Sequence, residues 1–138
     1  MGRNAPWLDK VQTIAKTMTN PTDVVVDVTD MAALMVQADL AIGAAGGTSW
    51  ERCALGLPSL MLVLADNQKA AAQAMDTANV AALLGDIRTT GWKERLWAIL
   101  DTVNSTHTLS AVSKDITDVI DGLGCVRCCT EIERILAK

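Results

Sequence analysis

The run of small residues from Gly43 to Gly47 is the part of the sequence best suited to bind an oxyanion through its backbone. It follows the apolar segment Asp39 to Ile42, which is typical of a buried strand. It precedes Thr48 to Glu51, whose S/T-x-x-E form is typical of a helix start. A strand, a glycine turn and a helix start leave amide N–H groups pointing at one spot, which favours phosphate. A glycine pair alone would also fit an ordinary tight turn.

Polar side chains near this turn have two interpretations each. Glu51 can accept two hydrogen bonds from a vicinal diol, or it can bond the Thr48 amide within a capping box. Asn67 can contact a substrate, or it can cap the helix that follows it. Arg52 can pair with a phosphate or with a surface acid, and the sequence does not decide between these partners.

A second cluster, Cys125, Cys128 and Cys129, has the spacing of one helix face and raises the question of a metal site. Zinc needs four ligands, and the remaining candidates, Cys53 and His107, are distant in the sequence. Small buried thiols are common in protein cores. We therefore predict no metal and no other cofactor, and the role of the cluster stays open.

The composition limits the classes of partner. With 138 residues, half of them hydrophobic, the chain is long enough for a single domain with its own core. A net charge of −4 argues against nucleic-acid binding. The most apolar stretch, Cys53 to Ala65, is too short to span a membrane. Four cysteines without an evident secretory signal indicate a reducing, cytoplasmic location.

Short apolar segments alternate with helical patterns along the chain. The expected strands are 24–28, 39–42, 60–64 and 80–83. The expected helices are 6–18, 30–37, one that starts at 48–51 and ends before Gly56, 68–77, 92–103, 109–120 and 125–136. We expect Thr29 to cap the second helix and Asp66 or Asn67 to cap the fourth.

This alternation predicts an α/β fold in which parallel strands are joined by helices, a Rossmann-like doubly wound sheet. Ligands of such sheets bind beyond the carboxyl ends of the strands, where the turns 28–31, 43–48 and 65–68 are expected. The chain opens with a helix, so we expect the first strand of the sheet to be missing or supplied by a partner. Trp92 and Trp97 are expected in the core, and Trp50 is expected to wedge the turn against the sheet.

The chain resembles a known enzyme family in five short segments, Asp30–Ala32, Ala38–Gly43, Trp50–Cys53, Leu55–Ser59 and Asp66–Gln68. The family is the UDP-2,4-diacetamido-2,4,6-trideoxy-β-L-altropyranose hydrolase of pseudaminic acid biosynthesis, and the resemblance is to its nucleotide-binding half. The chain is similar, more distantly, to the C-terminal half of the peptidoglycan N-acetylglucosaminyltransferase. Both families have the two-domain glycosyltransferase B architecture, so the resemblance implies that residues 1–138 are the C-terminal domain of a two-domain enzyme.

The resemblance implies how each part of a UDP-sugar would be held. The backbone from Val28 to Met31 would take the uracil edge, and Glu51 would accept both ribose hydroxyls. Asn67, with Gln68 beside it, would face the sugar or the attacking water, which makes Asn67 the candidate catalytic residue. The amides that would hold the diphosphate are those of Gly46, Gly47, Thr48 and Ser49.

The resemblance also implies a missing partner. In the hydrolase family a histidine of the N-terminal domain activates water, whereas the only histidine here, His107, matches no family motif. We therefore expect this chain to bind UDP or a UDP-sugar and to need an N-terminal catalytic domain for hydrolysis. Two alternatives stay open: the donor-binding half of a UDP-sugar glycosyltransferase, and a non-catalytic interaction module with the same fold.

Overall fold

The computed structural model describes residues 1–103 and 106–137, with their side chains except at 106–108. His107 therefore lies outside the residues whose side chains are described. The chain forms two compact units, Met1–Ala33 and Leu34–Lys138, which are considered separately below.

The first unit contains helix α1 (Leu8–Ala15), and the strand predicted at 24–28 does not form. Instead, the amino group of Met1 donates to the Val25 carbonyl at 2.6 Å, and the Asp27 N–H donates to the Met1 carbonyl at 2.9 Å. Asp27 has a φ of 51°, a left-handed conformation that interrupts an extended strand. The predicted strand is thus wrong, because the start of the chain takes the main-chain groups that a neighbouring strand would need.

Helix α2 (Met31–Val36) begins one residue later than predicted, and Asp30 caps it. The Asp30 Oδ1 accepts a hydrogen bond from the Ala33 N–H at 2.9 Å. The prediction that Thr29 is the cap is therefore wrong by one position. A carboxylate serves as well as a hydroxyl at this place, because both accept from an amide of the first helical turn.

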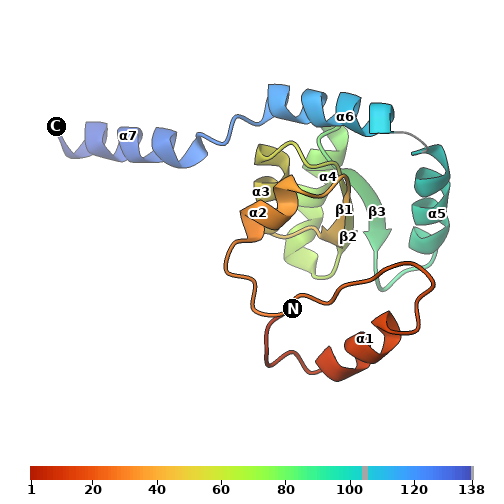
Figure 1. Cartoon of the computed structure of the whole chain (residues 1–138). Coiled ribbons are helices and arrows are strands. Elements are labelled where there is room, and N and C mark those ends of the chain that lie inside the picture. Colours follow the sequence, from red (N-terminus) through yellow and green to blue (C-terminus); the bar gives the residue numbers. More distant parts are fainter. Residues whose placement is uncertain (104–105, 138) are drawn as a thin grey trace. The chain divides into compact units, whose positions relative to one another are not determined.

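Three parallel strands form the sheet of the second unit, in the order β1 (Ala41–Ala44), β2 (Ser59–Val63) and β3 (Ala82–Asp86). Helix α3 (Thr48–Ala54) joins β1 to β2, and the short 3₁₀ helix η1 (Asp66–Gln68) with helix α4 (Lys69–Thr77) joins β2 to β3. Both α3 and α4 pack against the sheet (Figure 1). The predicted α/β class with a parallel, Rossmann-like sheet is confirmed.

The third strand lies further along the chain than the prediction of 80–83. Asn79, with a φ of 56°, turns the chain after α4, and Val80 and Ala81 are buried before the strand begins. These two residues are apolar because they fill the core and not because they belong to β3. Apolar runs cannot by themselves distinguish the two cases.

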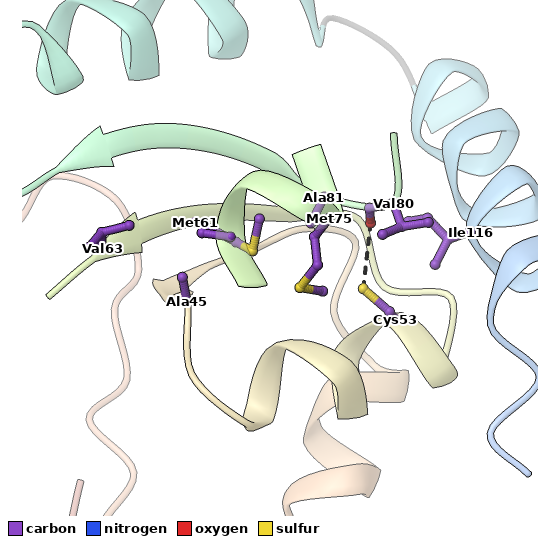
Figure 2. Close-up of a cluster of buried hydrophobic side chains, with 9 residues drawn as sticks. Ala45, Cys53, Met61, Val63, Met75, Val80, Ala81 and Ile116 are labelled. Atoms are coloured by element: carbon purple, nitrogen blue, oxygen red, sulfur yellow. Dashed lines mark hydrogen bonds between the residues drawn. The ribbon is translucent and has the colours of Figure 1, made fainter. Parts of the chain in front are cut away.

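The core lies between the sheet and helices α3 and α4, and Figure 2 shows it. Met61 on β2, Met75 on α4 and Cys53 on α3 are fully or almost fully buried. The Cys53 thiol also donates to the Val80 carbonyl, with sulfur and oxygen 3.5 Å apart. Burying one side chain of methionine size contributes about 1.5–3 kcal/mol, so these contacts fix α3 against the sheet.

The remaining helices are α5 (Trp92–Thr102), α6 (Thr106–Val119) and α7 (Gly124–Leu136). Trp92 is half-buried with its Cβ against Gly85, but Trp97 is 63% exposed, so its predicted place in the core is wrong. The three cysteines of α7 are exposed free thiols, which contradicts their interpretation as buried thiols. None of the described helices combines the length and the apolar character needed to cross a membrane.

Candidate functional site

The carboxyl ends of the three parallel strands meet at one edge of the sheet, as the alternating pattern predicted. In the register of the strands, Ala44 pairs with Leu62 and Val63 pairs with Asp86. The turns that follow these strands therefore begin side by side. In sheets of this kind, ligands bind at this edge.

The turn after β1 carries main-chain amides that are free to bind a ligand. The Ala45 N–H donates to the Leu62 carbonyl at 2.9 Å, which ties the start of the turn to β2. Within the described residues, the amides of Gly46, Gly47 and Thr48 donate to no main-chain or side-chain acceptor. The Ser49 amide donates to the Gly46 carbonyl at 2.9 Å, so three of the four predicted amides remain available.

Glu51 lies in the first turn of α3, is exposed, and is not part of a capping box. Gly47 and not Thr48 is the N-cap residue, and it has helical dihedral angles with no side-chain cap. A capping box requires the threonine itself at the N-cap in an extended conformation. The capping interpretation of Glu51 is therefore wrong, and its carboxylate accepts no hydrogen bond from the described residues. This leaves it available to a ligand.

Arg52, one residue further, lies on the core side of the same turn and is only 7% exposed. Its Nη2 donates to the Ala44 carbonyl at 3.1 Å and to the Ser49 Oγ at 2.9 Å. The Ser49 hydroxyl in turn donates to the Ala44 carbonyl at 3.0 Å. Among the described residues no acid pairs with Arg52, so the interpretation of a surface ion pair is wrong: the guanidinium bonds to the turn itself. Its pairing with a phosphate stays a prediction.

The turn after β2 reaches the turn after β1 through Gln68. The Gln68 Oε1 accepts a hydrogen bond from the Leu64 N–H at 3.0 Å. Its Nε2 lies 3.8 Å from the position that a β-carbon on Gly46 would occupy. The side-chain amide of Gln68 is therefore placed beside the free main-chain amides.

Asn67 is exposed in η1, and the described structure gives its side chain no partner. Helix α4 begins at Lys69 with Gln68 as N-cap residue and no side-chain cap. The prediction that Asp66 or Asn67 caps this helix is thus wrong, because a 3₁₀ turn separates both from the helix start. The catalytic role of Asn67 stays a prediction.

Asp66 instead joins a charged cluster with Lys69, Asp86 and Arg88. Arg88 Nη2 lies 2.8 Å from Asp66 Oδ1 and 2.6 Å from Asp86 Oδ2, and Lys69 Nζ lies 2.9 Å from Asp66 Oδ1. Hydrogen bonds from Arg88 and then Lys69 lower the pKa of Asp66 to about 2, and those from Arg88 lower the pKa of Asp86. The cluster ties the loop after β2 to the loop after β3.

Sequence reasoning missed this cluster because it ended the third strand at residue 83. With β3 extending to Asp86, the Asp86 and Arg88 pair falls at the carboxyl edge of the sheet. A polar residue directly after an apolar run was the available signal. It was obscured because the buried residues Val80 and Ala81 were taken as part of the strand.

The two residues predicted for the uracil edge, Val28 and Met31, belong to the first compact unit. Val28 is half-buried, and Met31 is the exposed first residue of α2. Their role in binding the base stays a prediction.

A cavity of about 270 Å³ lies at the amino ends of β1 and β2, lined among others by Asp39 and Ser113, and thus at the other end of the strands from the free amides. Within the part of the chain that the structure describes, no three His, Cys, Asp or Glu residues are grouped as metal ligands would be.

Comparison with known families gives a match over most of the chain. The model of the glycosyltransferase family 28 C-terminal domain matches residues 1–117, which end within α6. No curated protein and no solved structure matches the chain. Because this family is of the glycosyltransferase B type, the fold expected for this half, a Rossmann-like α/β domain, is confirmed. The second, N-terminal domain stays a prediction. The narrower resemblance to the pseudaminic acid hydrolase stays a prediction.

Proposed function

Because the chain belongs to the family of glycosyltransferase family 28 C-terminal domains, we propose that it binds the UDP part of a nucleotide sugar at the carboxyl edge of its sheet. Domains of this family bind the nucleotide-sugar donor in glycosyltransferase-like proteins. The observation that carries the proposal is the set of three amides, at Gly46, Gly47 and Thr48, that donate to no acceptor within the described residues. They are held beside the Gln68 side chain at the edge where such sheets bind ligands.

The chemistry of the turn suits a diphosphate. Main-chain N–H groups donate to phosphate oxygens and need no counter-charge of their own. Held in place before the ligand arrives, they would also stabilise the negative charge that develops on a departing UDP. The turn cannot supply the whole affinity, because a helix start contributes about 0.3–1 kcal/mol per anionic group. A micromolar ligand requires about 8 kcal/mol.

The rest of the affinity is proposed to come from the base, the ribose and the sugar. Glu51 is exposed in the first turn of α3, and its carboxylate would accept both ribose hydroxyls. Asn67 and Gln68 would face the sugar or the attacking water from the turn after β2. The backbone from Val28 to Met31 would take the uracil edge.

For the full enzyme, we propose hydrolysis of the UDP-sugar, with an N-terminal catalytic domain supplying the water-activating histidine. The motifs Trp50–Arg52 and Asp66–Gln68 support this choice over transfer. A cytoplasmic location belongs to the proposal, because all four cysteines are free thiols, as suits a reducing compartment.

The second candidate function is the donor-binding half of a glycosyltransferase, which the name of the family favours. The third is a non-catalytic module.

Ligand titration tests the binding proposal directly. UDP, UMP, uridine and ADP are added separately to the full 138-residue chain, and backbone amide chemical shifts are followed. We expect UDP to bind more tightly than UMP and ADP, with the largest shifts at Gly46, Gly47 and Thr48. A well-folded sample whose amides do not respond to UDP would refute the proposal and support the non-catalytic module.

A second assay separates the two enzymes once the N-terminal domain is joined to this chain. UDP released from a UDP-sugar in water, without any acceptor, indicates the hydrolase. UDP release that requires an added acceptor indicates the transferase.

A further inference from the structure

Arg52 is a buried cation without an anionic partner. The residue is 7% exposed, and none of the ion pairs formed by the described residues includes it. Its Nε is fully buried and donates to no acceptor in the described structure. Buried charges in proteins are normally paired, because an unpaired charge loses its hydration without compensation. Arg52 therefore requires an explanation beyond packing.

The contacts of Arg52 all lie on one turn. The guanidinium bonds Ala44 and Ser49, and its Nη1 lies 2.7 Å from the place where a β-carbon on Gly43 would stand. Residue 43 must be glycine for the guanidinium to occupy this position. The turn that carries the free amides of Gly46, Gly47 and Thr48 is thus held from the core side by one arginine.

The charge of Arg52 makes this support different from a neutral one. Burial lowers the pKa of Arg52, and the nearby Cys53 and Glu51 oppose this effect, yet an arginine stays protonated in proteins. An anion bound to the amides would lie over the same turn and would compensate the charge below it. The anion would then be held both by the hydrogen bonds from the amides and by its attraction to Arg52, which is stronger where water is excluded.

We propose that Arg52 is a positioning residue of the diphosphate site. Its guanidinium holds the turn from Gly43 to Ser49 in its anion-binding shape, and the bound diphosphate serves as its counter-charge. This inference rests on the proposed binding of UDP and adds a residue to it. It assigns the selectivity for the phosphate part of the ligand to a side chain that does not need to touch the base or the ribose.

The test compares three variants of the full chain, Arg52→Gln, Arg52→Lys and Ser49→Ala, with the unchanged protein. Uridine, UMP, UDP and inorganic pyrophosphate are titrated, and thermal unfolding is followed for each variant. We expect Arg52→Gln to weaken UDP and pyrophosphate by about tenfold or more, the effect of losing one charge-assisted interaction, and uridine by less than about twofold. The affinity of Arg52→Lys for UDP and pyrophosphate should lie between those of the unchanged protein and Arg52→Gln, because lysine keeps the positive charge but lacks the planar guanidinium.

The outcomes separate the inference from the proposed function. If the unchanged protein does not bind UDP, the proposed function fails and the inference fails with it. If the unchanged protein binds UDP and a folded Arg52→Gln does so equally well, only the inference is overturned. Should Arg52→Gln not fold, the affinities of Arg52→Lys and Ser49→Ala decide. A loss of affinity for UDP and pyrophosphate alone supports the inference. An equal loss of affinity for UDP and uridine overturns it.

Discussion

Gln68 lies beside Gly46, with its Nε2 3.8 Å from the position that a β-carbon on Gly46 would occupy. The contact joins the turns that follow β1 and β2, two neighbouring parallel strands. It places a side-chain amide next to three free main-chain amides. The candidate site is therefore shared between turns that are about twenty residues apart in the sequence.

Replacing Gly47 with alanine should separate binding from stability. Gly47 has a φ of −52° and no atom within 4 Å of an added β-carbon, so alanine fits the backbone. Alanine there should raise the free energy of unfolding by about 0.4–1 kcal/mol, because it restricts the unfolded chain. The same methyl group would stand beside the free amides, so UDP affinity should fall. Urea unfolding and UDP titration of one sample check both effects; unchanged UDP affinity would remove the turn from the site.

Gly43→Ala should destabilise the fold, although it adds the same methyl group. The new β-carbon would stand 2.7 Å from Arg52 Nη1, so the guanidinium would have to shift, which would disturb its bonds to Ala44 and Ser49. We expect a loss of about 1–3 kcal/mol in the free energy of unfolding, as for overpacked cores. Gly2→Ala is the matched control, since nothing lies within 4 Å of its added carbon. Equal urea midpoints for the two variants would contradict the packing of Arg52.

Glu51→Ala should weaken UDP binding with little effect on folding. Its carboxylate accepts no hydrogen bond within the described residues, so the free energy of unfolding should change by less than about 0.5 kcal/mol. Two lost hydrogen bonds to the ribose should lower UDP affinity by about tenfold or more. Glu94→Ala is the control, because Glu94 is also exposed in the first turn of a helix, α5. Calorimetry that gives the same UDP affinity for both variants would rule out the ribose role.

The charged cluster around Arg88 should make the free energy of unfolding depend on pH in the acidic range. The pKa of Asp66 is lowered to about 2 in the folded chain, below its unfolded value of about 3.9, so the folded state binds fewer protons. Its contribution is therefore complete above about pH 4 and is lost as the pH falls through about 2. Urea unfolding between these pH values should show a smaller loss of stability for Arg88→Gln than for the unchanged protein. Parallel pH curves would show that the cluster contributes nothing.

Local patterns in the sequence were sufficient for the α/β class, the parallel sheet and the position of the glycine turn. The apolar runs that became β1 and β2 are bounded by Gly46–Gly47 and by Gly56–Pro58, and these residues act on the backbone next to them. Such effects depend on near neighbours in the chain. For this reason they could be predicted without a structure.

The tertiary structure decided which polar groups were free. Glu51 is released from a capping box because the helix starts from Gly47, and Arg52 bonds to the turn and not to an acid. Asp66 and Arg88 meet across 22 residues because β2 and β3 are neighbours in the sheet. Hydrogen-bond partners and burial depend on which distant segments the fold brings together. Short-range residue types and spacing do not contain that information.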